Sequence, residues 1–111
     1  MNICVTGCLG FIGFNIINNL LKRKNINILG IDNIDNSIYP IEEKKEKLKV
    51  LKKIKNFNFL KIDISNINSL NSFYKKNKIS YTINLAGQAS VRNSLKDYNK
   101  FIKDNILGFN N

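Results

Sequence analysis

Apolar and polar positions along the chain alternate between two kinds of segment. Runs of apolar residues short enough for buried strands occur at residues 2–6, 27–32, 57–63 and 81–86. Segments with apolar residues spaced three and four apart, as in amphipathic helices, occur at residues 12–24, 41–54, 66–78 and 97–109. The pattern predicts four strands, each followed by a helix, with a loop over residues 87–96 before the last helix.

This alternation predicts an α/β fold, with a parallel sheet covered by helices on both faces. Right-handed crossovers between consecutive strands give the spatial order 3-2-1-4. The first and fourth strands then flank the point where the strand order reverses. Open α/β sheets bind ligands there, beyond the carboxyl ends of the strands.

A glycine-rich segment joins the first predicted strand to the first predicted helix. It reads V-T-G-x-x-G-F-I-G over residues 5–13. Gly7 permits the tight turn, Gly10 lets a pyrophosphate approach the backbone, and Gly13 lets the helix pack closely on the sheet. The unpaired N–H groups at the helix N-terminus would face the phosphates. In this strand–turn–helix context the motif predicts a dinucleotide site on a Rossmann-like sheet.

The other strand ends carry further candidates for cofactor contact. Asp32 ends the second strand, where a carboxylate accepts hydrogen bonds from the adenosine ribose; a turn-forming aspartate is the alternative. Asp63 either approaches the adenine or caps the next helix. The segment Leu85-Ala86-Gly87 leaves room for the middle of a dinucleotide. Because the Asp32 carboxylate would repel a 2′-phosphate and no arginine directly follows it, we expect NAD rather than NADP.

Composition changes this interpretation little. The 111 residues are enough for one domain, and the net charge of +10 raises the question of nucleic-acid binding. All but two of the 18 basic residues are lysines, however, and Asn, Ile and Lys share AT-rich codons. The lysines are densest over 44–55, on an expected solvent face without interleaved aromatic residues. We therefore expect no nucleic-acid partner.

Several other classes of protein are disfavoured. With two cysteines and no histidine, the chain cannot supply the roughly four ligands of a structural zinc site, and we expect no metal. Cys4 should be a small core residue, and Cys8, in the glycine turn, is expected to be accessible. No apolar run approaches the roughly 18 residues of a membrane span, and no signal peptide is evident. A cytoplasmic protein is the expectation.

Five segments in order resemble the extended short-chain dehydrogenases/reductases, the nucleotide-sugar epimerases and dehydratases. They are T-G-C-L-G-F-I-G at 6–13, G-I-D-N at 30–33, K-I-D-I at 61–64, N-L-A-G-Q-A-S-V-R-N-S-L at 84–95 and D-N-I-L-G at 104–108. The segments at 32–39 and 86–95 are most similar to those of UDP-glucuronate 4-epimerases. A dehydratase or decarboxylase of the same superfamily and a non-catalytic NAD-binding module are the alternatives.

The resemblance implies which residues meet the ligands. It implies substrate contacts by Gln88, Ser90 and Arg92 with a nucleotide sugar such as a UDP-sugar, although Arg92 as a solvated loop residue is the alternative. The NAD contacts implied by the resemblance and the glycine motif are Gly7, Gly10, Phe11, Ile12, Gly13, Asp32, Asn33, Asp63, Ile64, Leu85, Ala86 and Gly87.

One departure from the family pattern concerns catalysis. The family uses a Ser or Thr after strand five and a Tyr-x-x-x-Lys on the following helix, and residues 1–111 are expected to end before that strand, as the N-terminal part of an NAD-binding domain with an incomplete second half. Tyr74 and Lys78 match Tyr-x-x-x-Lys literally, but they precede strand four and are not expected to be catalytic. The resemblance also implies a homodimer through the last helix for the complete protein.

Overall fold

Four parallel strands form a single sheet in the computed structural model, which describes residues 1–111. The sheet order is β3-β2-β1-β4, as predicted. In the register, Cys4 of β1 lies between Leu29 of β2 and Thr82 of β4. The carboxyl ends of β1 and β4 therefore lie side by side at the switch point. The strands are β1 (Asn2–Thr6), β2 (Asn27–Asp32), β3 (Phe57–Lys61) and β4 (Tyr81–Asn84).

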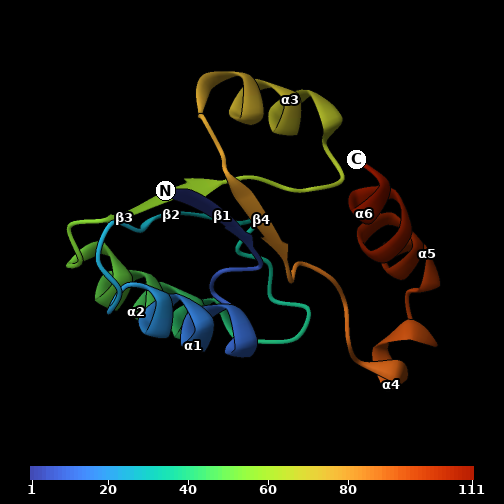
Figure 1. Ribbon diagram of the computed structural model, residues 1–111. Helices are drawn as coiled ribbons and strands as arrows, with labels where there is room; N and C mark the ends of the chain where they lie inside the picture. The colour runs from blue at the N-terminus through green and yellow to red at the C-terminus, as the bar shows by residue number, and fades with distance from the viewer.

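Helices cover both faces of this sheet. Figure 1 shows α1 and α2 on one side and α3 on the other, with the C-terminal helices beyond the carboxyl ends of the strands. None of the helices has both the length and the hydropathy needed to cross a bilayer. The helical segments are α1 (Phe11–Leu20), α2 (Ile41–Lys52), α3 (Ile67–Lys76), α4 (Val91–Ser94), α5 (Tyr98–Ile102), the π-helical turn η1 (Lys103–Leu107) and α6 (Gly108–Asn110).

The core consists of two apolar clusters separated by the sheet. Along β1, Ile3 and Val5 point into the cluster under α1 and α2, whereas Cys4 points into the cluster under α3. This alternation follows from the period of two in a strand. The first cluster is closed by Ile17 and Leu51, which are fully buried. The two central strands, β1 and β2, are therefore buried on both faces, as their continuous apolar sequences predict for a covered parallel sheet, whereas the edge strands β3 and β4 are largely exposed.

Two predictions about the segment after β4 need correction. The expected loop over 87–96 contains the short helix α4, which Ser90 caps by accepting a hydrogen bond from the backbone N–H of Asn93 at 3.3 Å. The expected helix over 97–109 is wound as a π turn in its middle. The spacing of apolar residues predicts neither α4 nor the π turn, because a one-turn helix has no measurable period and a π turn shifts the spacing by only one residue.

Cys8 is buried, so the expected accessibility of its thiol was wrong. After β1 the chain turns inward, and Cys8 and Leu9 fill the space between the sheet and α1 with no exposed surface. Burial, with a further contribution from the nearby carboxylate of Asp32, raises the pKa of the Cys8 thiol far above its usual range. The group stays protonated at neutral pH and behaves as a small apolar side chain, as Cys4 does.

Candidate functional site

The glycine turn between β1 and α1 has the geometry that the sequence predicts. Gly7 adopts a left-handed conformation, with φ of +62°. A Cβ at Gly7 would also lie 2.8–2.9 Å from backbone atoms of Leu85 and Ala86, so a side chain is excluded on two grounds. The amide N–H of Gly10 donates to the carbonyl of Gly7 at 3.0 Å and closes the turn.

Gly10 and Gly13 have different surroundings. A Cβ at Gly13 would overlap the carbonyl oxygen of Gly7, which is fixed in the turn. A Cβ at Gly10 would meet only that oxygen, at 3.2 Å, and Gly10 is the N-terminal cap residue of α1 without a side-chain cap. Gly13 therefore permits the packing of α1 against the turn, and Gly10 leaves the helix N-terminus open to a ligand.

Thr6 ties β1 to the end of β4, and the sequence did not suggest this role. Its hydroxyl donates to the side-chain oxygen of Asn84 and accepts from the backbone N–H groups of Leu85 and Ala86, both at 2.9 Å. The two strand ends that flank the switch point are thereby held together. Residues 85–87 take their position beside the glycine turn from this contact.

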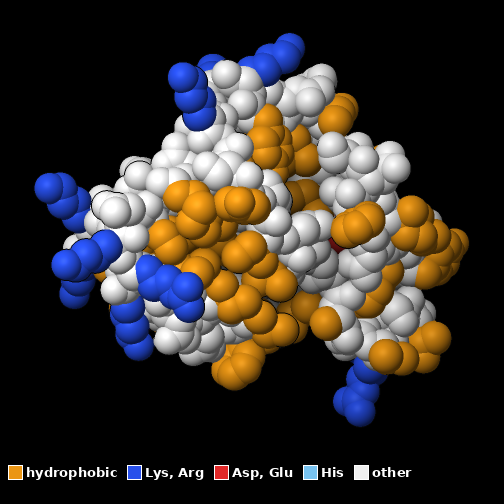
Figure 2. Space-filling model, in the orientation of Figure 1, with side chains coloured by type: hydrophobic (Ala, Val, Ile, Leu, Met, Phe, Trp, Pro, Cys, Tyr) orange, Lys and Arg blue, Asp and Glu red, His pale blue; other side chains and the backbone are white.

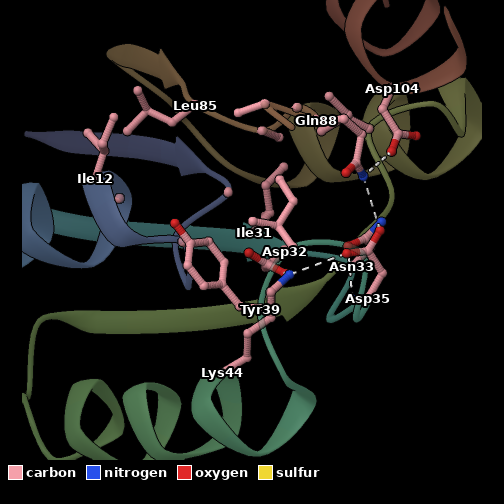
Figure 3. A pocket seen from close by; sticks show the side chains of 18 of the residues that line it. Ile12, Ile31, Asp32, Asn33, Asp35, Tyr39, Lys44, Leu85, Gln88 and Asp104 are labelled. Carbon is pink, nitrogen blue, oxygen red and sulfur yellow. Dashed lines mark hydrogen bonds and ion pairs between the residues drawn. The ribbon is translucent and has the colours of Figure 1, made fainter. Parts of the chain in front are cut away.

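Asp32 lies at the centre of a polar network at the end of β2 (Figure 3). One carboxylate oxygen, Oδ2, accepts from the backbone N–H of Leu9 at 3.2 Å. The other, Oδ1, accepts from the N–H of Ile34 at 2.8 Å and forms an ion pair with Lys44 at 3.1 Å. Asp32 and Lys44 are both only 6% exposed. The turn at Ile34 has φ of +56°, an uncommon conformation for a β-branched residue, next to this carboxylate.

Lys44 is the main residue that sequence reasoning placed wrongly, on a solvent face. A signal was present, because residue 44 falls on the apolar stripe of α2 with Ile41, Leu48 and Leu51. A lysine on a core-facing stripe requires a buried anionic partner, since an unpaired buried charge is strongly unfavourable. Its partners are Asp32 and, at 3.6 Å, Asp35.

Asp63 shapes the turn after β3 rather than capping the next helix. Its Oδ1 accepts from the backbone N–H and the hydroxyl of Ser65, at 2.9 and 2.7 Å, and its Oδ2 pairs with Lys103 at 3.3 Å. The cap of α3 is Asn66, which accepts from the N–H of Ser69 at 3.0 Å. Burial raises the pKa of Asp63, but the contacts from Ser65 and Lys103 outweigh it and hold the pKa below its usual value.

A second polar network joins the loop after β2 to the C-terminal helices. The side-chain amide of Gln88 donates to Asp104 at 2.7 Å and to Asp35 at 3.3 Å (Figure 3). Lys100 of α5 pairs with Asp35 at 2.9 Å and lies 3.7 Å from Asp104. We name Asp35, Gln88, Lys100 and Asp104 the polar clasp. It connects three segments that are distant in sequence, across one side of the site.

The polar clasp shifts the pKa values of its members. Burial raises the pKa of Asp35, but the ion pair with Lys100 and the hydrogen bond from Ser37 outweigh burial and hold the pKa at about 2. The hydrogen bond to Asp35 raises the pKa of Lys100 in turn, against the opposing effect of burial. Both groups are thus charged throughout the physiological range.

These segments enclose a cavity of about 270 Å³ at the carboxyl ends of the strands. All twelve residues named above as NAD contacts line it, and so does Gln88 among the three substrate candidates. Eight lining residues were not named from the sequence as ligand contacts: Ile31, Asp35, Ile38, Tyr39, Lys44, Ile62, Ala89 and Asp104.

The remaining candidates lie elsewhere. Ser90 caps α4, and Arg92 is exposed on that helix, makes no ion pair and does not line the cavity. Tyr74 and Lys78 are also outside the cavity, and the hydroxyl of Tyr74 contacts that of Thr82 at 2.9 Å. Burial raises the pKa of Tyr74 above its usual value, which does not favour a role as a base at neutral pH.

Comparisons with known proteins agree with this geometry. A UDP-glucuronate 4-epimerase of Thermodesulfobacterium geofontis is 40% identical over 104 residues, covering 94% of this chain and 32% of that protein. A dTDP-D-glucose 4,6-dehydratase of Dictyostelium discoideum is 36% identical over 107 residues, covering 96% of this chain and 24% of that protein. The chain thus spans 24–32% of the length of these relatives.

Solved structures give the same result. The UDP-glucuronic acid 4-epimerase of Bacillus cereus, in complex with UDP-glucuronic acid and NAD, superposes with a TM-score of 0.86 at 31% identity, over 97% of this chain and 33% of that one. The sequence model of the GDP-mannose 4,6 dehydratase family matches residues 4–111. With the glycine turn, the strand order and the acidic end of β2 in place, the chain belongs to this family of NAD-dependent epimerases and dehydratases.

Proposed function

We propose that this chain binds NAD in the cavity at the carboxyl ends of the strands, as the cofactor-binding part of a nucleotide-sugar epimerase acting on UDP-glucuronate. The observation that carries the proposal is the convergence of all twelve candidate contacts on one cavity. The B. cereus relative, with NAD in its complex, supports the choice of cofactor.

The residues of the cavity fit the parts of NAD. The pyrophosphate would lie against Gly10 and the N-terminal N–H groups of α1, where no side chain intervenes. The adenosine ribose would lie at Asp32, and the middle of the dinucleotide would pass Ala86 and Gly87. When bound, NAD supplies reversible hydride transfer at a sugar carbon.

The sugar would approach from the side of Gln88, Ser90 and Arg92. Arg92 is exposed and free of ion pairs, so its guanidinium is available to a sugar carboxylate or a phosphate. A dehydratase activity of the same family is the second candidate, since the D. discoideum relative carries that name. A non-catalytic NAD-binding module is the third.

Residues 1–111 themselves are proposed to lack turnover, as the N-terminal part of one NAD-binding domain. Hydride removal from a sugar hydroxyl carbon needs a proton acceptor within hydrogen-bond reach. The chain has no histidine, Tyr74 lies outside the cavity, and Asp32 is already engaged by Lys44. We further propose a cytoplasmic location, no nucleic-acid partner and a homodimer for the complete protein.

Calorimetric titration tests the proposed binding. We expect saturable binding of NAD by the purified chain and weaker binding of NADP, because Asp32 disfavours a 2′-phosphate. Equal or tighter binding of NADP would refute the choice of cofactor. Gly10→Val should abolish binding by filling the pyrophosphate path, and Asn15→Val, at an exposed position of α1 outside the cavity, is the comparison variant.

A conversion assay tests the proposed reaction. UDP-glucuronate is incubated with NAD and either the 111-residue chain or a longer polypeptide supplying the Tyr-x-x-x-Lys helix. We expect UDP-galacturonate only with the longer polypeptide. A dehydrated keto-sugar product would instead favour the dehydratase. Turnover by the 111 residues, abolished in Tyr74→Phe, would overturn the view that Tyr74 is not catalytic.

A further inference from the structure

Lys44 contacts the carboxylate proposed to bind the adenosine ribose, and it lines the same cavity. It lies in the second turn of α2 with a side chain that is only 8% exposed. Its ammonium is 3.1 Å from Oδ1 of Asp32 and 3.6 Å from Oδ1 of Asp35 (Figure 3). A lysine packed this deeply has little conformational freedom, so its ammonium is held beside these two carboxylates.

The acceptor capacity of Asp32 is largely used within the protein. A carboxylate oxygen accepts about two hydrogen bonds. Oδ1 already accepts from the backbone N–H of Ile34 and from Lys44, whereas Oδ2 accepts only from the N–H of Leu9. One position, on Oδ2, remains for a ligand. A ribose has two adjacent hydroxyl groups, and Asp32 can therefore accept from only one of them.

Lys44 can serve the other hydroxyl. An ammonium carries three protons, and at most two of those of Lys44 are directed at Asp32 and Asp35. The third is available to an oxygen in the cavity. The same ammonium also reduces the summed charge of Asp32, Asp35 and Lys44 from −2 to −1, which weakens the repulsion that a 2′-phosphate would meet.

We propose that Lys44 is a specificity-determining residue of the ribose subsite. Lys44 donates to the ribose hydroxyl that Asp32 cannot accept from, and it moderates the preference for NAD over NADP that Asp32 sets. This rests on the proposed binding of NAD in the cavity. The proposed hydrogen bond from Lys44 would be a direct polar contact from α2, which contributes no residue to the glycine turn.

Two matched variants test the proposal. Lys44→Met removes the ammonium and keeps much of the side-chain volume, and Lys45→Met is the control, because Lys45 is exposed on the same helix. Dissociation constants for NAD and NADP are measured by calorimetry, and folding is checked by circular dichroism. A hydrogen bond from a charged donor corresponds to a factor of about ten or more in affinity.

We expect Lys44→Met to weaken the binding of NAD by about tenfold and the binding of NADP by more. The dissociation constant of NADP divided by that of NAD therefore rises. Lys45→Met should change neither constant. A folded Lys44→Met protein with an unchanged or lower ratio would overturn the proposal while leaving NAD binding intact. Failure of the wild-type chain to bind NAD would overturn both the proposed function and this inference.

Wild-type protein provides a second test that does not depend on the variant folding. NAD analogues that lack either the 2′- or the 3′-hydroxyl of the adenosine ribose are titrated. We expect both to bind more weakly than NAD, because each hydroxyl has its own protein partner. If removal of one hydroxyl leaves the affinity unchanged, Asp32 alone recognises the ribose and the proposal is wrong.

Discussion

At the scale of single residues, the three glycines of the β1–α1 turn serve separable purposes. Gly7 provides a left-handed backbone, Gly13 a close backbone contact, and Gly10 an open approach for a ligand. These are the three purposes that the sequence motif predicts, and the structure shows what surrounds each glycine. Their different surroundings lead to different consequences of the same substitution.

We expect Gly13→Ala to destabilise the fold and Gly10→Ala to leave it nearly intact. The added methyl at Gly13 overlaps a fixed backbone carbonyl, and overpacking of this kind costs roughly 1–3 kcal/mol. Gly10→Ala should instead weaken NAD binding, because its methyl stands at the pyrophosphate path. Thermal unfolding separates the two effects. A Gly13→Ala protein as stable as wild type would show that α1 can shift away from the turn.

The ion pair of Asp32 with Lys44 makes Asp32→Ala more than a ligand-binding variant. Removing the carboxylate leaves a buried ammonium with only Asp35 nearby, and such a loss costs about 3–5 kcal/mol. The double variant Asp32→Ala with Lys44→Met should recover part of that stability. Denaturant unfolding of both single variants and the double variant gives the coupling. Strictly additive effects would show that the pair does not interact.

At the scale of elements, the polar clasp holds the loop after β2 against α5 and η1. Its members come from three segments, and none of them lies in the regular part of the sheet. The ends of the strands define the floor of the cavity, and the polar clasp fixes one wall. Charge is therefore part of what holds this wall in place.

We expect the polar clasp to contribute less to the stability of the fold in acid. The pKa of Asp35 is about 2 in the folded chain, below its usual 3.8, so its contribution is present above pH 4 and declines as the pH falls toward 2. Asp35→Asn lacks this contribution at every pH. Between pH 5 and 2, wild type should lose more thermal stability than Asp35→Asn does. Parallel losses in the two proteins would contradict the role of Asp35.

Sequence patterns predicted the elements whose apolar residues repeat clearly. All four strands, their order and α1 to α3 follow from periodicity and the rule of right-handed crossovers. The helix α4 and the π turn η1 did not, because short or irregular turns depend on tertiary contacts such as those of Gln88. Lys44 was misplaced because its charge was weighed above its position on the apolar stripe of α2.

At the scale of the whole molecule, the C-terminal helical segment has two distinct faces. Asp104 and Gly108 are buried, and Gly108 packs against Ile64. The opposite face carries apolar side chains that are 51–73% exposed, and Figure 2 shows hydrophobic side chains on the surface over this segment. We name these residues the outer stripe: Tyr98, Ile102, Ile106 and Phe109.

A contiguous exposed apolar surface marks an association site or an aggregation hazard. We therefore expect the chain to self-associate at micromolar concentration, in keeping with the homodimer proposed for the complete protein.

The double variant Ile102→Lys with Ile106→Lys should remain monomeric, because two ammonium groups would have to be desolvated in the contact. Val50→Lys is the control, since Val50 is an exposed apolar residue on α2, away from the outer stripe. Sedimentation velocity over a range of concentrations measures the outcome. A wild-type chain that sediments as a monomer at every concentration would show that the outer stripe does not mediate association. An equal effect of Val50→Lys would show that added charge, rather than the outer stripe, governs association.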